Sequence, residues 1–168
     1  MSERSRKIAI VPGSFDPMTL GHRALIEAVC KRYETVYVAV MTNFAKTPFL
    51  ESGTRCQIAG LTLADLPNAT VIADDGLLVD LFDRLQADAV CKGYRNDADL
   101  AYERRQDEWN RAHNPHFFTE LIPAAPGTEA ISSTLVRDRL EKGEPLSGLM
   151  AEAAIPVLQA AVAKMKRK

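Results

Sequence analysis

The chain has 168 residues, of which 46% are hydrophobic and 26% charged, as in an ordinary globular protein that can bury a sizeable core. Its formal net charge of −1 argues against a nucleic-acid or membrane-surface protein, although a local basic pocket is compatible with it. No apolar run approaches the roughly 18 residues of a membrane span, and the polar start "MSERSRK" is not followed by the apolar segment of a signal peptide. We therefore expect one cytoplasmic domain that comprises residues 1–168.

The chain has three cysteines, Cys30, Cys56 and Cys91, which lie far apart in the sequence. Their odd number and wide spacing argue against a disulfide framework or a zinc site. His113 and His116 flank a turn but lack further ligands. We expect no protein metal site, and cysteines that serve as small buried hydrophobic residues.

The hydrophobic pattern predicts five strands that alternate with helices. The strands are continuous apolar runs at residues 7–11, 35–41, 69–74, 88–93 and 117–122. Helical patterns cover residues 25–30, 54–66, 77–85, 98–112 and 132–142, and the tail after residue 145 is expected to form two more helices divided near Pro156. The predicted fold is therefore α/β: a Rossmann-like, doubly wound, five-stranded parallel sheet with a helical C-terminal extension.

Polar clusters follow the predicted strands. In a doubly wound sheet, ligands bind beyond the carboxyl ends of the strands, which all lie at one edge. We therefore expect one functional site, built from residues 14–22, 43–46, 74–76, 92–95 and the region of Ser132.

The segment "GSFDPMTLGH" joins the first predicted strand to the first helix. Gly13 allows a sharp turn and a close approach of a ligand to the backbone. Gly21 removes a side chain where the helix begins, so an anion can approach the positive end of the helix, and His22 follows in the first turn. This arrangement indicates a phosphate site, but its spacing is also compatible with a tight turn and a half-buried histidine.

Four segments of the chain resemble one known family. "GSFDPMTLGH" is similar to the signature of the nucleotidylyltransferase superfamily, with Thr19 to His22 as its T-x-G-H box. "AKTPF" resembles the lysine loop of the phosphopantetheine adenylyltransferase family, and "KGYRNDADLAYE" resembles that family's R-G-x-R-x-x-x-D-x-x-Y-E segment. "ISSTLVR" resembles the superfamily's I-S-S-x-x-x-R/K box, which also occurs in nicotinamide mononucleotide adenylyltransferases. The four segments occur in order across most of the chain.

The resemblance implies a single nucleotidylyltransferase domain that transfers the adenylyl group of ATP to 4′-phosphopantetheine, giving dephospho-coenzyme A and pyrophosphate. The attacking phosphate is already an anion, so the site needs cations and N–H donors more than a strong base. The implied catalytic residues are His22, Lys46 and Arg95. The implied ATP-binding residues are Ser14, Phe15, His22, Gly93, Tyr94, Arg95, Glu103, Thr128, Ser132, Ser133 and Thr134. The implied phosphopantetheine-binding residues are Ser14, Lys46, Leu78 and Lys92.

Several of these residues also have ordinary structural interpretations. Lys46 is compatible with a solvated surface lysine, and Glu103 with a solvated helix face. Ser132 and Ser133 are compatible with a helix N-cap, and Leu78 with a core position. The family usually has arginine where this chain has Lys92, so the charge is kept but the planar two-pronged donor is lost.

The resemblance also implies Mg²⁺ with the ATP, a homohexamer, feedback by coenzyme A, and no nucleic-acid or membrane partner. Two other functions remain open. One is adenylyl transfer to nicotinamide mononucleotide, whose flat ring usually requires an aromatic partner; Trp109, the only tryptophan, lies inside a predicted helix. The other is a non-catalytic, nucleotide-binding regulatory module.

Overall fold

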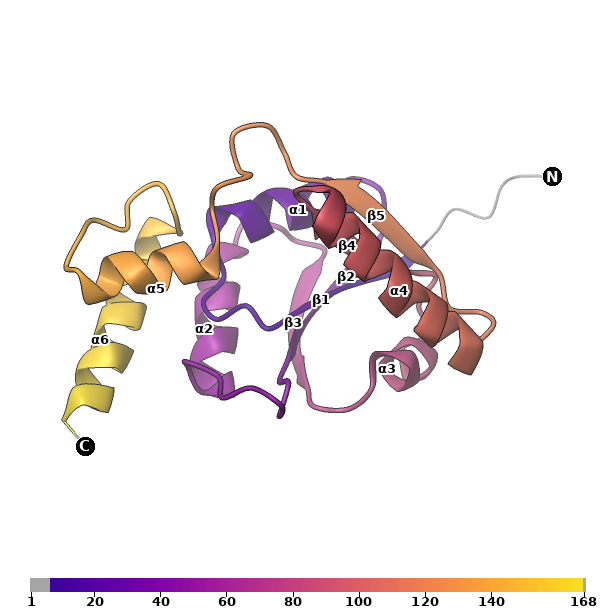
Figure 1. Cartoon of the computed structure of the whole chain (residues 1–168), viewed down its shortest axis with the longest axis horizontal. Helices are drawn as coiled ribbons and strands as arrows, with labels where there is room; N and C mark the ends of the chain where they lie inside the picture. Colours follow the sequence, from indigo (N-terminus) through magenta and orange to yellow (C-terminus); the bar gives the residue numbers. More distant parts are fainter. Residues whose placement is uncertain (1–6, 168) are drawn as a thin grey trace.

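A five-stranded parallel sheet forms the centre of the computed structural model, which describes residues 7–167 (Figure 1). The sheet order is β3-β2-β1-β4-β5, and all the neighbouring strands are parallel. The fold class predicted from the sequence is therefore confirmed. The strands are β1 (Ile8–Gly13), β2 (Thr35–Met41), β3 (Ala69–Asp74), β4 (Ala89–Tyr94) and β5 (Thr119–Pro123).

Helices connect the strands and extend the chain beyond the sheet. They are α1 (Leu20–Cys30), α2 (Ser52–Thr62), α3 (Leu78–Arg84), α4 (Asp97–His113), α5 (Ser133–Glu141), the 3-10 turn η1 (Glu152–Ala154) and α6 (Ile155–Lys166).

Both faces of the sheet are covered, which explains the continuous apolar strands. In β1, Ala9 and Val11 belong to a core cluster with α1 and α2, whereas Ile10 belongs to a second cluster with Val79 and Phe82 of α3. Successive side chains of a strand point to opposite faces, so burial on both faces requires an apolar residue at every position.

The chain reverses its direction of winding at β1. It passes from β1 to β2 and β3 on one side, then returns to β4 and β5 on the other. At such a switch point the loops that leave neighbouring strands diverge and open a crevice beyond the carboxyl ends. The loops after β1 and β4 are therefore placed to form a site.

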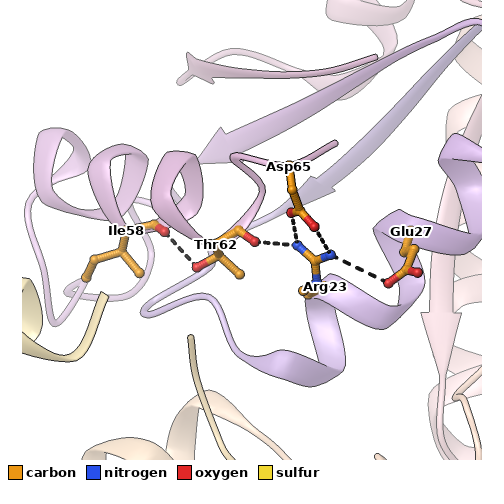
Figure 2. Close-up of polar contacts among 5 residues, drawn as sticks. All are labelled: Arg23, Glu27, Ile58, Thr62 and Asp65. Atoms are coloured by element: carbon orange, nitrogen blue, oxygen red, sulfur yellow. Dashed lines mark hydrogen bonds and ion pairs between the residues drawn. The ribbon is translucent and has the colours of Figure 1, made fainter. Parts of the chain in front are cut away.

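Arg23, the residue after His22, anchors the start of α1 against the end of α2 (Figure 2). Its Nη1 donates to the Thr62 carbonyl oxygen at 2.7 Å, and its two Nη atoms bond the two oxygens of Asp65 at 2.6 and 2.9 Å. Glu27 adds a contact at 3.8 Å. This two-pronged pairing lowers the pKa of the Asp65 carboxyl and raises that of the guanidinium. It fixes the helix that carries His22.

The C-terminal extension differs in detail from the sequence prediction. The first tail piece is only the short turn η1, and Pro156 lies in the first turn of α6 rather than between two helices. Proline is compatible with the first helical turn because its missing N–H has no intrahelical partner there. Similarly, α2 ends at Thr62, before the predicted end at residue 66.

No helix within residues 7–167 is long and apolar enough to cross a membrane. Cys91 is buried, as predicted, whereas Cys30 and Cys56 are partly buried. The start "MSERSR" lies outside the described residues.

Candidate active site

A cavity of about 1330 Å³ lies at the carboxyl edge of the sheet and is lined by residues that follow all five strands. It brings together most of the residues that the sequence predicted. Among its lining residues are Ser14, Phe15, His22, Leu78, Lys92, Gly93, Tyr94, Arg95, Glu103, Thr128, Ser132 and Ser133. Two predicted residues, Lys46 and Thr134, are exposed and do not line it.

The turn after β1 is shaped by a ring contact. Phe15 has a left-handed backbone with φ of 46°, and a Cβ on Gly13 would lie 2.9 Å from the Phe15 ring. A side chain at position 13 would therefore require the Phe15 ring to move. The Phe15 ring meets the His22 imidazole edge to face, with centroids 5.1 Å apart. The glycine of this turn thus allows an aromatic ring to pack against the histidine.

His22 occupies the third position of α1 and takes part in its N-cap. The Thr19 Oγ1 accepts from the His22 backbone N–H at 3.3 Å, and the His22 Nδ1 accepts from the Thr19 backbone N–H at 2.9 Å. This reciprocal pair is a capping box with histidine where glutamate usually stands. Because Nδ1 is an acceptor, the neutral ring carries its hydrogen on Nε2. The T-x-G-H spacing therefore fixes both the orientation and the tautomer of the ring.

Burial lowers the pKa of His22, with a further contribution from the positive charge of Arg95, from 6.5 to about 4. The imidazole is therefore neutral at pH 7 and can act there as a hydrogen-bond donor through Nε2.

This pKa predicts how stability depends on pH. Between about pH 6.5 and pH 4 the unfolded chain binds a proton at His22 that the folded protein does not, so acid favours unfolding. We expect this residue alone to remove about 2–3 kcal/mol of stability as the pH falls through that window. Urea unfolding at pH 7 and pH 4.5 should show a smaller acid loss for His22→Gln than for wild type. An equal loss in both proteins would contradict the prediction.

Two cationic side chains near the end of β4 have carboxylate partners on α4. Lys92 Nζ lies 2.9 Å from Glu103 Oε2, and both side chains are largely buried. Arg95 donates its backbone N–H to Asp99 Oδ2 at 3.1 Å and its Nε to the same oxygen at 3.4 Å. Asp99 in turn donates its N–H to Asn96, the N-cap of α4. The helix thus orients both cations at the cavity wall.

The start of α5 supplies another part of the wall, with Ser132 and Ser133. Ser132 is its N-cap, with Oγ accepting from the Leu135 N–H at 3.0 Å, as its structural interpretation predicted. The Ser133 hydroxyl donates to the Pro17 carbonyl oxygen at 2.7 Å, so its one hydrogen is engaged. The backbone N–H groups of the first turn are the donors that this helix can offer to an anion.

The predicted lysine loop connects β2 to α2 at the cavity edge. Asp16 holds its far end, because its carboxylate accepts from the backbone N–H groups of Phe49 and Leu50 at 2.7 and 2.9 Å. Lys46 lies in the exposed part of this loop. The loop is therefore tied to the turn after β1 while its lysine remains in solvent beside the cavity.

The sequence prediction missed most of the α4 wall. One face of this helix lines the cavity, although its run of charged residues suggested a solvated surface. The missed signal is helical spacing, since positions three, four and seven apart share a face. Trp109 is among these residues, so its position within a helix does not remove it from the site, contrary to our expectation. The wall consists of Asp99, Tyr102, Glu103, Arg105, Gln106, Trp109 and Asn110.

The described residues contain no group of three or more histidine, cysteine or acidic side chains that could hold a metal ion. The cavity instead combines a neutral imidazole donor, cationic side chains and a helix start beside a glycine turn. Such a set of donors and positive charges suits phosphoryl oxygens. The fold and the site together are typical of an α/β protein that binds a nucleotide at the switch point of its sheet.

Comparisons with known proteins identify the class. The family model described as cytidylyltransferase-like matches residues 10–139. A solved structure from Vibrio parahaemolyticus, assigned as a nicotinate-nucleotide adenylyltransferase, superposes with a TM-score of 0.65 at 19% identity and covers 91% of each chain. At this identity the superposition shows a shared fold. The chain is thus a nucleotidyltransferase of the cytidylyltransferase-like class.

Sequence relatives narrow the class to one family. The chain is 34% identical over 163 residues to the phosphopantetheine adenylyltransferase of Bifidobacterium longum (strain DJO10A), covering 96% of this chain and 98% of that protein. It is 35% identical over 144 residues to that of Limosilactobacillus reuteri (strain DSM 20016), covering 86% and 83%. The chain belongs to the phosphopantetheine adenylyltransferase family.

Proposed function

We propose that this protein transfers the adenylyl group of ATP to 4′-phosphopantetheine, a step of coenzyme A biosynthesis. The observation that carries the proposal is the convergence of the neutral His22 donor with Lys92, Arg95 and the start of α5 on one cavity. The names of the relatives supply the two substrates.

The chemistry is an in-line displacement at the α-phosphorus of ATP. A phosphate oxygen of phosphopantetheine forms the new P–O bond, and the bond to the bridging oxygen breaks as pyrophosphate leaves with the electron pair. His22 Nε2–H donates to an α-phosphate oxygen as charge accumulates in the transition state. Arg95 and the N–H groups at the start of α5 hold the departing β- and γ-phosphates. The turn after β1, which contains Ser14, lies against the phosphates.

The acceptor phosphate is held by Lys46 and Lys92 on this proposal. Lys92 is paired with Glu103 in the structure, so binding of a phosphate has to compete with or share that contact. Leu77 and Leu78, which follow β3, give the cavity an apolar edge suited to the pantetheine arm.

Mg²⁺ enters with the triphosphate on this proposal. The cations of the site do not suit a divalent metal, and the described residues form no ligand cluster for one. The ion usually binds substrate phosphates and waters with few protein ligands, so the nucleotide itself supplies the coordination. When bound, it offsets phosphate charge.

By family resemblance we also propose that the protein forms a homohexamer and is inhibited by coenzyme A. Light scattering would test the first proposal, and an inhibitor titration the second.

A pyrophosphate-release assay with ATP and each acceptor in parallel tests the function. We expect release with 4′-phosphopantetheine and little with nicotinamide mononucleotide. Trp109 lines the cavity, so the structure offers an aromatic partner to a flat ring, and this second acceptor is a necessary comparison. Release only with the mononucleotide would replace the proposed acceptor, and release with neither would favour a regulatory module.

Lys46→Ala should weaken acceptor binding while leaving the fold intact. The side chain is exposed, so its loss costs little stability. A charge-assisted contact to phosphate contributes about 1.5–3 kcal/mol, so we expect the KM for phosphopantetheine to rise about 10–100-fold. The exposed Lys31, which does not line the cavity, gives the matched control Lys31→Ala. An unchanged KM in Lys46→Ala would remove this lysine from the acceptor site.

A further inference from the structure

Arg55, in the first turn of α2, is the largest side chain among the fully buried ones, with 1% exposure. A buried guanidinium is costly unless its N–H groups are hydrogen-bonded. Here Nε donates to the Leu50 carbonyl oxygen at 3.0 Å, and Nη2 donates to Thr42 Oγ1 at 2.8 Å. Nη1 donates to the carbonyl oxygens of Ser14 at 3.1 Å and Met41 at 3.4 Å.

All four acceptors are neutral. Within residues 7–167, the recorded ion pairs include none that joins Arg55 to a carboxylate. The guanidinium is therefore hydrogen-bonded without a direct ion pair in the described part of the chain. A group kept only for packing would be replaced at little cost by an apolar side chain of similar volume.

The acceptors belong to three segments that meet at one side of the cavity. Ser14 is in the turn after β1, Met41 and Thr42 are at the end of β2, and Leu50 is at the far end of the lysine loop. Ser14, Met41 and Thr42 line the cavity themselves. One planar group thus sets the distance between the phosphate turn and both ends of the loop that carries Lys46.

We propose that Arg55 is a positioning residue for the phosphate site: it joins these three segments in the geometry that binds the acceptor, and its charge strengthens the binding of anions at the Ser14 turn. The proposal rests on the proposed function for the identity of the acceptor. The charge acts through the interior beneath the turn, where interactions between charges are stronger than in water. Arg55 itself touches no substrate, because its N–H groups are directed to the protein backbone and Thr42.

The test compares Arg55→Met, which removes the charge at similar length, with Arg55→Lys, which keeps the charge but lacks the fork. Calorimetric titration of inorganic pyrophosphate measures anion binding without turnover, and steady-state kinetics separate KM from kcat. Arg32→Met is the matched control, since Arg32 pairs with Glu120 and does not line the cavity.

We expect the pyrophosphate Kd of Arg55→Met to rise about tenfold, and the phosphopantetheine KM to rise about tenfold or more in both Arg55 variants. Arg32→Met should change neither value. Loss of thermal stability with wild-type Kd and KM would overturn the proposal. If Arg55→Met does not fold, an unchanged KM in Arg55→Lys overturns it. If the wild type uses no phosphopantetheine, the proposed function fails, and the pyrophosphate Kd of Arg55→Lys and Arg55→Met still decides the role of Arg55.

Discussion

His22→Ala is expected to lower kcat about 10²–10³-fold while the protein remains folded. Loss of one preorganised donor to a developing oxyanion typically costs roughly 2.7–4 kcal/mol of transition-state stabilisation. In this protein the ring is oriented by the Thr19 N–H, so its Nε2–H requires no reorganisation before it donates. The measurement is the rate of pyrophosphate release at saturating ATP and phosphopantetheine.

The substitution also removes part of an N-cap, which costs about 1 kcal/mol of stability. His22→Gln separates the two effects, because glutamine is a usual capping-box residue at this position but places its donor differently. We expect it to recover stability without recovering the rate. His116→Ala, an exposed histidine that does not line the cavity, is the control for histidine loss. A near-normal rate in His22→Ala would exclude His22 from the mechanism.

Arg95→Ala should reduce kcat/KM for ATP about 10²–10³-fold. Its guanidinium is the proposed partner of the departing pyrophosphate, and Asp99 holds it in place through Nε. Arg95→Lys keeps the charge but loses the planar fork, so an intermediate loss is expected. Arg111→Ala, an exposed position near the end of α4, is the matched control.

A second readout makes this prediction specific. Arg95 lowers the pKa of His22, so removing its charge should raise that pKa from about 4 toward the ordinary value of 6.5. Burial is the larger cause of the shift, so the recovery should be partial. NMR titration of the His22 ring measures it. An unchanged pKa together with an unchanged kcat/KM would show that Arg95 does not act at the site.

The fold could be predicted because its signals are local. β2 and β3 were predicted with their observed bounds, since both are β-branched runs that end at turn residues. The T-x-G-H box is likewise local: within four residues, Thr19 caps the helix and fixes the tautomer of His22, which is the proposed donor. The predicted end of α2 was wrong, because hydrophobic periodicity specifies the ends of a helix less well than its interior.

By itself, then, the sequence determined the order of strands and helices, the edge where the site lies, and the family's four motifs. Only the tertiary structure decided how those motifs meet. In the folded protein the Ser133 hydroxyl donates to Pro17, and Lys92 pairs with Glu103. Trp109 lines the cavity, and Arg55 is buried beneath three segments. Periodicity arises from neighbouring residues along one helix or strand, whereas these contacts join residues up to 116 positions apart and exist only after the sheet and its helices have packed.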